Sequence, residues 1–200
     1  MENPSNNKID KEIIEKSFRD IMEKGLGLDM NDENFKDSPK RFAKSYSEIF
    51  SGLMDSEREV HEILDKSFPT KYNGMVLEKG ITVFSMCPHH FLPIRYEVSI
   101  AYIPNGRALG LSKLARIIKL MAKMPCLQED FTERIVNEIE DHIKPLGVIC
   151  VVNGAHYCMR MRGIEQKDSW TTTSSVRGVF KTKDEMELKY YNLLNNKPEL

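Results

Sequence analysis

The alternating segment RYEVSIAYIP, residues 95–104, constrains the fold of this chain more than any other stretch. Its large apolar side chains occupy every second position, at Tyr96, Val98, Ile100 and Tyr102. The positions between them are polar, at Arg95, Glu97 and Ser99. Because successive side chains of a strand point to opposite faces, this pattern is typical of an antiparallel sheet with one buried face. We therefore expect a sheet whose apolar face is covered by another layer of structure.

Helical and extended segments follow a simple order along the rest of the chain. Apolar residues recur at helical spacing in five segments, which we place at residues 9–24, 38–52, 57–64, 112–123 and 129–143. Besides residues 95–104, extended segments are predicted at 80–86, 148–162 and 171–180. Two strands, two helices and two strands after a helical start predict an α+β fold, with helices on one face of an antiparallel sheet. We assign residues 1–70 to an N-terminal helical extension and residues 71–200 to the main domain.

The composition excludes several classes of protein. The 200 residues carry a formal net charge of -1, which gives no overall attraction to nucleic acid or to an anionic membrane. No apolar run approaches the roughly 18 residues that a membrane span requires, and the polar N-terminus lacks the apolar core of an export signal. We therefore expect a cytoplasmic protein whose cysteines are reduced and whose partners include neither nucleic acid nor a membrane.

Two short patterns, CPHH at residues 87–90 and HYC at residues 156–158, indicate a metal site. Thiolate and imidazole are the preferred ligands of zinc, and three such ligands with one open position are typical of a catalytic centre. If residues 148–162 form one strand, His156 and Cys158 point to the same face. The strand after Cys87 would then bring its ligands toward Cys158 across the sheet.

The spacing alone leaves the ligand set open. Cys-x-x-His spacing favours His90, which would leave His89 and His156 as groups for proton transfer. The competing interpretation is a structural zinc site with four ligands that recruits Cys126 or Cys150. Cys150 lies within an apolar strand, where a small buried residue is the simpler interpretation.

A second group of polar residues suggests an elongated anionic ligand. In the helix at residues 112–123, Ser112, Lys113 and Arg116 can present one cationic face. On a regular strand, Arg160 and Arg162 would share the face of His156, and Arg162 would lie roughly 20 Å from His156. A nucleoside triphosphate has about that reach.

The way in which the phosphates would be bound indicates where on the nucleotide the reaction occurs. No G-x-x-x-x-G-K-[ST] run is present, so a phosphate cradle of that kind is absent from the sequence. If side chains bind the phosphates, the phosphates would contribute binding, and the reaction would take place at the base or the sugar. Gln128 and Glu129 offer an amide and a carboxylate, which suit the donors on the edge of guanine.

Five segments resemble the signature motifs of the GTP cyclohydrolase I family, in the order and at the spacings of that family. The segments are FSMCPHHFLP, GLSKLARI, LQEDFT, HYCMRMRG and TTTS. The resemblance extends from Asp37 to Phe180, most of the chain. It implies the tunnelling fold, in which a four-stranded antiparallel sheet carries two helices on one face. It also implies a toroidal homo-oligomer with active sites between subunits.

The resemblance implies a role for each candidate residue. One zinc ion per chain would be bound by Cys87, His90 and Cys158. Catalytic roles would fall to His89, His156 and Ser112. The substrate GTP would be bound by Arg41, Lys113, Arg116, Gln128, Glu129 and Arg162. Of these residues, Arg41 would come from a neighbouring subunit, and Gln128 and Glu129 would hold the guanine.

The implied reaction converts GTP and water to 7,8-dihydroneopterin triphosphate and formate, the first step of pterin and folate biosynthesis. His156 would protonate the imidazole nitrogen as the ring opens. The chain departs from the family at Pro88, where a glutamate is usual, so a carboxylate and a backbone donor beside the metal are missing. Two alternatives are a tunnelling-fold enzyme of deazaguanine metabolism, which would use a thiol and no catalytic zinc, and a non-catalytic subunit that binds GTP or a pterin.

Overall fold

The computed structural model describes residues 8–54 and 56–196, and it separates the chain into two compact units. The first unit ends at residue 55, and the second begins at Ser56. The sequence had suggested a boundary at residue 70, after the helix predicted at residues 57–64. That helix, α3 (Ser56–Leu64), belongs to the second unit, because Val60 and Leu64 are buried in its core.

The first unit is helical, as the apolar periodicity predicted. It contains α1 (Lys11–Asp20), the π-helical turn η1 (Ile21–Gly25), α2 (Ser38–Ile49) and the 3-10 turn η2 (Ser51–Leu53). The Asp10 carboxylate caps α1 by accepting hydrogen bonds of 3.0 Å from the backbone N–H groups of Glu12 and Ile13. Phe18 of α1 stacks on Phe42 of α2 with ring centroids 3.7 Å apart, which joins the two helices.

The second unit is built on a four-stranded antiparallel sheet with the strand order β2-β3-β5-β6. Its strands are β2 (Val76–Met86), β3 (Pro93–Ile103), β5 (Gly147–His156) and β6 (Thr171–Gly178). A small second sheet pairs β1 (Ser67–Pro69) with β4 (Arg107–Leu109). The helices are α3, α4 (Leu111–Ala122), α5 (Gln128–Ile143), α6 (Tyr157–Arg160), α7 (Val179–Thr182) and α8 (Asp184–Asn195).

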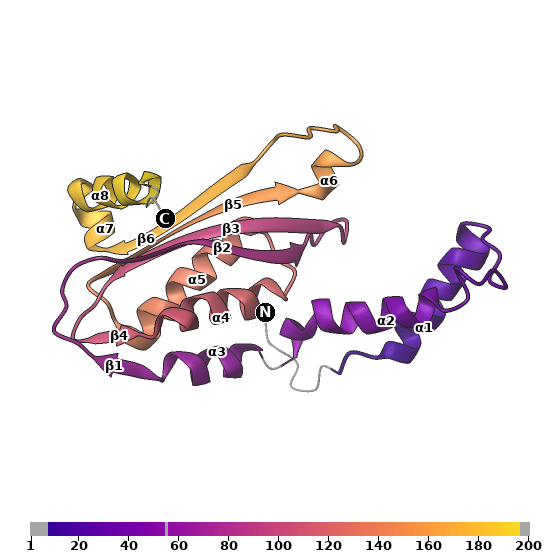
Figure 1. The fold of residues 1–200 in the computed structure, drawn as a ribbon, viewed down its shortest axis with the longest axis horizontal. Helices are drawn as coiled ribbons and strands as arrows, with labels where there is room; N and C mark the ends of the chain where they lie inside the picture. Colours follow the sequence, from indigo (N-terminus) through magenta and orange to yellow (C-terminus); the bar gives the residue numbers. More distant parts are fainter. Residues whose placement is uncertain (1–7, 55, 197–200) are drawn as a thin grey trace. The chain divides into compact units, whose positions relative to one another are not determined.

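One face of the sheet forms the main core with α3, α4 and α5 (Figure 1). The alternation in β3 is confirmed, because its apolar set is almost fully buried in this core: Tyr96, Val98, Ile100 and Tyr102. The helices contribute the apolar stripes expected from the sequence, such as Leu114 and Ile118 of α4 and Phe131 and Ile135 of α5. An antiparallel sheet with helices packed on it is therefore the frame that holds the site.

The other face of the sheet is covered in part by α7 and α8, which the sequence analysis did not anticipate (Figure 1). Phe180 and Tyr190 pack on Ala101 and Ile149 in a second apolar cluster. The Tyr190 hydroxyl donates a hydrogen bond of 3.1 Å to the backbone oxygen of Ser99. In the described part of the chain, no helix has the length and apolar composition to cross a membrane.

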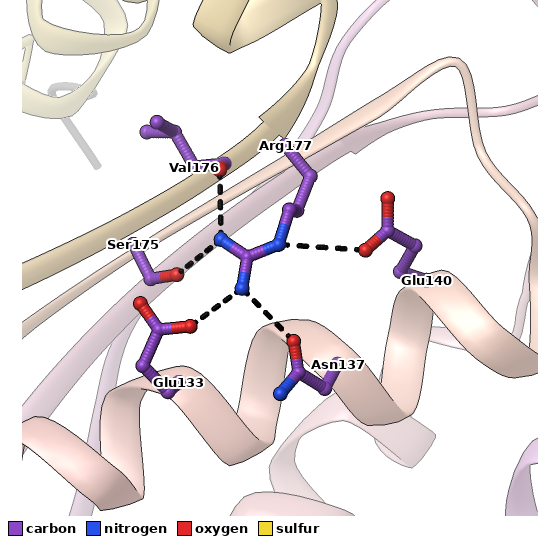
Figure 2. A network of polar contacts seen from close by, with 6 residues as sticks. All are labelled: Glu133, Asn137, Glu140, Ser175, Val176 and Arg177. Carbon is purple, nitrogen blue, oxygen red and sulfur yellow. Dashed lines mark hydrogen bonds and ion pairs between the residues drawn. The ribbon is translucent and has the colours of Figure 1, made fainter.

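Arg177 fastens β6 to α5 through a network of polar contacts (Figure 2). Its guanidinium donates to the Glu133 carboxylate at 2.5 Å and to the Asn137 side-chain oxygen at 3.0 Å. A third partner on α5 is Glu140, whose carboxylate lies 3.5 Å from Nε. The remaining N–H groups bond to the Ser175 hydroxyl and the Val176 carbonyl on β6 itself. One side chain thus ties three turns of α5 to the edge strand of the sheet.

The prediction of a single strand over residues 148–162 is wrong beyond His156. Strand β5 stays paired with β3 up to the register pair Ile94 and His156. The next residue of β3 is Pro93, which has no N–H with which to continue the ladder. Without a partner strand, the chain turns into the short helix α6 at Tyr157. His156 therefore does not share a strand face with Cys158, Arg160 or Arg162.

Candidate metal centre

A closed turn after β2 positions the first pair of candidate ligands. The backbone N–H of Cys87 donates to the carbonyl of Leu92, and the N–H of Phe91 donates to the carbonyl of Cys87, each at 2.9 Å. Phe91 adopts a left-handed conformation with φ of 51°, which closes the turn. As a result, the Cys87 Sγ and the His90 Nδ1 lie 3.6 Å apart. Pro88 stands inside this turn without separating them.

Helix α6 supplies the third member of the cluster. The ligand atoms of Cys87, His90 and Cys158 all lie within 4.8 Å of one another. Tetrahedral zinc separates a sulfur from a nitrogen ligand by about 3.6 Å, given Zn–S and Zn–N bonds of about 2.3 and 2.1 Å. The separation between Cys87 and His90 matches that value. The donor set and its spacing therefore fit a zinc ion with one open position.

Burial and a neighbouring thiol disfavour the charged form of Cys158. Cys87 and Cys158 are free cysteines. The pKa of Cys158 is raised by burial, and then by its hydrogen bond to Cys87 and the charge of that residue, while Arg162 opposes the shift. Two adjacent thiolates repel each other, and a bound cation would remove that penalty. Cys126 and Cys150 lie outside this cluster, so a fourth cysteine ligand has no support here.

His156 lies at the end of β5, where Gln128 at the start of α5 holds its ring. The Gln128 Nε2 donates to the carbonyls of Val152 and Thr171 at 3.0 and 2.9 Å, and it also contacts the Thr173 hydroxyl. With its nitrogen so engaged, the Gln128 Oε1 is the acceptor for the His156 Nε2 at 2.8 Å. This contact assigns the proton of the neutral ring to Nε2 and leaves Nδ1 as the basic nitrogen.

Burial lowers the pKa of His156, and the negative charge of Glu129 partly opposes that change. The ring is therefore neutral near pH 7 and can accept a proton from an acidic partner. Glu129 is exposed beside the ring at the start of α5, whereas Gln128 is almost fully buried, with 2% of its surface exposed. Of the two residues expected at a guanine, only Glu129 is open to solvent in this chain.

Gly154 is a part of this arrangement that the sequence analysis missed. A Cβ atom at this position of β5 would overlap the Gln128 Oε1 and would lie 3.0 Å from the His156 Nε2. The lack of a side chain therefore makes room for the hydrogen bond between Gln128 and His156. No local sequence signal marks this need, because Gln128 comes from a helix that is distant along the chain.

The basic residues of α4 form a separate group. Ser112 and Arg116 are exposed and Lys113 is half-buried. Arg116 lines a pocket of about 230 Å³ together with Ile63 of α3, Lys119 and Leu120 of α4, and Lys123 just after α4. The lining of that pocket contains none of the three candidate metal ligands. The pocket beside Arg116 and the metal centre therefore share no residue.

The arginines after His156 have different surroundings from those that a strand would give them. Arg160 donates a hydrogen bond of 2.8 Å to the carbonyl of Ser169, and its guanidinium lies 5.0 Å from the centre of the Trp170 ring. It therefore closes the loop between α6 and β6. Arg162 is exposed in that loop, and its charge acts on Cys158. The extended row of cations predicted from His156 to Arg162 is not formed.

The two remaining candidates belong to different units of the chain. The His89 Nδ1 lies 4.0 Å from the Cys87 Sγ, and the residue is exposed beside the metal ligands. Arg41 lies on α2 in the first unit, where its guanidinium is 3.6 Å from the Asp37 carboxylate.

The fold and this site together define a class of protein: an α+β chain with a cluster of two thiols and one imidazole at the end of an antiparallel sheet, beside an oriented histidine. The sequence model of GTP cyclohydrolase I matches residues 14–195. The chain belongs to the GTP cyclohydrolase I family.

Individual relatives are similar over nearly their whole length. GTP cyclohydrolase 1 of Thermoanaerobacter pseudethanolicus is 42% identical over 190 residues, covering 94% of this chain and 99% of that protein. The enzyme of the same name from Clostridium perfringens is 42% identical over 187 residues, with the same coverage. That from Carboxydothermus hydrogenoformans is 44% identical over 175 residues, 87% of this chain and 89% of the relative. A solved structure of the archaeosine synthase QueF-Like in the apo form has a TM-score of 0.43 and 20% identity, covering 54% of this chain and 97% of that chain.

Proposed function

We propose that this protein is a GTP cyclohydrolase I, which converts GTP and water to 7,8-dihydroneopterin triphosphate and formate. Membership of the family and the relatives named GTP cyclohydrolase 1 support this function. The observation that carries it is the meeting of Cys87, His90 and Cys158 beside a neutral, oriented His156. A guanine ring offers both a carbon for water to attack and a nitrogen to be protonated.

Zinc is the metal that we propose for the centre, with one ion per chain bound by Cys87, His90 and Cys158. Such an ion, when bound, supplies Lewis-acid activation of water at neutral pH. The Nδ1 of His156 accepts and returns a proton at the reacting base, while its Nε2–H stays on Gln128. His89, exposed next to Cys87, is placed to assist a second proton transfer as the ribose opens.

We propose that different groups of residues bind the base and the ribose triphosphate of the substrate. We propose that Glu129 meets the guanine, and that Ser112, Lys113, Arg116 and Arg162 hold the ribose and the triphosphate. All hydrogen-bonding atoms of the Gln128 side chain have partners within the chain. Its role is therefore to orient His156, and any contact with the base would need these bonds to rearrange.

We further propose the tunnelling fold and a toroidal homo-oligomer in which Arg41 of a neighbouring subunit completes each site. Two observations support sharing. The pocket that Arg116 lines contains none of the three candidate metal ligands, and large apolar side chains are exposed on the segments that flank those ligands. The exposed set includes Phe84, Phe91, Met161, Ile164 and Trp170. Exposed apolar surface of this kind is typical of subunit interfaces.

Metal content and product release test the function together. We expect the purified protein to contain about one zinc per chain and to release formate from GTP, with a pterin that becomes fluorescent after oxidation. Cys158→Ser should lose both the zinc and the activity. Cys126→Ser is the matched control, because Cys126 lies outside the cluster and interacts with Arg134. Elemental analysis and a formate assay measure the two quantities.

The outcomes separate the alternatives. Turnover of another substrate without zinc would favour a tunnelling-fold enzyme of deazaguanine metabolism. Binding of GTP with no formate, in a zinc-containing protein, would favour a non-catalytic subunit. Equal loss of zinc in Cys158→Ser and Cys126→Ser would contradict the ligand assignment.

A further inference from the structure

A second group of metal-ligating side chains lies outside the candidate active site. His61 of α3 and both Glu138 and His142 of α5 have ligand atoms that all lie within 4.8 Å of one another. No sequence pattern connects them, because His61 is far from the other two along the chain. The helices α3 and α5 pack against each other in the main core, and this packing brings the three side chains together.

The spacing of these atoms suits a small divalent ion. The His61 Nε2 lies 3.4 Å from the Glu138 Oε2. The His142 ring reaches the same carboxylate edge-on, with its Nδ1 3.7 Å from that oxygen. Bonds of about 2.1 Å in tetrahedral geometry separate two ligand atoms by about 3.4 Å. His61 and Glu138 are therefore spaced for one ion, and a rotation of the His142 side chain that presents Nε2 would complete the set.

A hydrogen bond orients one of the two imidazoles in the manner of a metal ligand. The His142 Nδ1 lies 2.8 Å from the backbone carbonyl of Glu138, one turn earlier on α5. Because a carbonyl only accepts, Nδ1 is the protonated nitrogen, and Nε2 keeps its lone pair. Metal-binding histidines usually donate their other N–H in this way, which fixes the tautomer and the orientation of the ring.

The exposure and the donor types of these three side chains favour an ion between them over a contact that only joins the helices. The side chains of His61, Glu138 and His142 are 43%, 21% and 17% exposed, so an ion can enter without opening the core. The two imidazole rings are 4.5 Å apart between centroids. Two imidazoles and one carboxylate form a donor set for a divalent metal, and the carboxylate supplies a negative charge to the ion.

The cluster is distinct from the candidate active site. Gln128, which holds His156, is the first residue of α5, and His142 is in its last turn. At a rise of about 1.5 Å per residue, the two positions are separated by about 21 Å. An ion at His142 would therefore join α3 to the far end of α5 and would not contact the reacting base.

We propose that His61, Glu138 and His142 form a second metal site for a divalent transition metal such as zinc, cobalt or nickel. Two imidazoles and one carboxylate leave further positions for water, and imidazole favours these metals over magnesium or calcium. The ion bridges two helices of the main core.

Titration of the zinc-containing enzyme with cobalt tests the site. After equilibrium dialysis against cobalt, we expect two metal ions per chain by elemental analysis. The cobalt spectrum should lack the intense thiolate-to-metal band that the cysteine centre would give. His61→Gln and His142→Gln should hold one ion, with binding of the second weakened at least about tenfold. Release of formate from GTP should be unchanged in His61→Gln.

Neighbouring residues provide the controls. Glu62→Gln on α3 and Asp141→Asn on α5 remove one exposed negative charge each, next to the two histidines, and should still hold two ions. Circular dichroism checks that each variant is folded, and Glu138→Gln provides a third route to the same loss. The proposal is overturned if the wild type holds a single ion at saturating cobalt. It is equally overturned if folded His61→Gln and His142→Gln keep the second ion.

Discussion

At Gly154 the lack of a side chain determines the position of two others. The amide of Gln128 lies where a Cβ atom would be, and its oxygen accepts the Nε2–H of His156. Burial lowers the pKa of His156, so the ring needs this contact to hold one tautomer and one orientation while neutral. The proton-transfer role proposed for His156 thus depends on Gly154, a residue without a side chain.

Gly154→Ala should therefore impair catalysis without removing the metal. The methyl group displaces Gln128 and frees the His156 ring, so we expect kcat to fall about 10- to 100-fold. The zinc content should stay at the wild-type level. Nitrogen chemical shifts of His156 report its tautomer, and Gly25→Ala is the control because an added Cβ there meets nothing within 4 Å. An unchanged tautomer with a reduced kcat would contradict the positioning role.

His156→Ala separates proton transfer from binding. We expect the variant to keep its zinc and to bind GTP with similar affinity, since His156 is not one of the three candidate ligands. Its kcat should fall by about 10²- to 10⁴-fold, the usual contribution of a general acid or base. Elemental analysis, equilibrium binding of GTP and the formate assay give the three quantities. Formate release at the wild-type rate would remove His156 from the mechanism.

At the scale of elements, the contact between α5 and β6 holds Gln128, and through it His156, in position. Helix α5 carries Gln128, and β6 carries Thr171 and Thr173, which both contact that side chain. Further along the same pair of elements, Arg177 binds Glu133, Asn137 and Glu140 (Figure 2). The network thus fixes the register of the helix against the strand.

Arg177→Ala should lower the free energy of unfolding by about 2 kcal/mol, because one part-buried guanidinium makes several hydrogen bonds that water replaces only partly. Urea denaturation at pH 7 measures the change. Arg177→Lys should recover part of the loss, since it keeps the charge but cannot reach three partners at once. A loss equal to that of a typical exposed salt bridge would show that the network has little energetic role.

The same network predicts a dependence of stability on pH. The hydrogen bond from Arg177 holds the pKa of Glu133 below its usual value of 4.5. A carboxyl whose pKa is lower in the folded state adds stability that is present above pH 4.5 and is lost as the pH falls through the folded value. The difference in stability between wild type and Arg177→Ala should therefore shrink below pH 4.5. A difference that stays constant down to the acid transition would exclude the ion pair as its source.

At the scale of the whole molecule, the proposed oligomer can be tested by mixing two inactive chains. If Arg41 and His156 of one active site come from different subunits, Arg41→Ala and His156→Ala should complement each other. In a random one-to-one mixture, about a quarter of the sites receive both intact residues. We therefore expect co-expressed, doubly tagged oligomers to show about a quarter of the wild-type formate release.

Each variant purified alone is the control for this experiment and should be nearly inactive. If both residues of a site belong to one chain, every chain in the mixture carries one defect. The mixture would then be as inactive as its components, and shared sites would be excluded.

Local physical rules made much of this fold predictable. The period-two pattern of β3 has one energetically acceptable orientation, with Tyr96, Val98, Ile100 and Tyr102 in the core. The helical periodicities likewise located α2, α4 and α5, because an apolar stripe must be buried. The pairing of Cys87 with His90 followed from their spacing, which a single turn can close.

Local periodicity and spacing could not predict contacts between segments that are distant along the chain. The end of β5 depends on whether β3 can continue the ladder, and Pro93, which has no N–H, stands across the sheet from the point where β5 gives way to α6. Helix α8 was missed because its apolar partners, such as Ala101 and Ile149, lie on other strands.

The sequence by itself determined the kinds of elements, their order, and the residue types available for a thiolate and imidazole metal centre. Only the tertiary structure decided which groups meet: Gln128 with His156 over Gly154, and His61 with His142 across two helices. The physical reason is that periodicity and spacing express local backbone geometry. Contacts between distant segments depend instead on how all the elements pack at once, and no single segment encodes that packing.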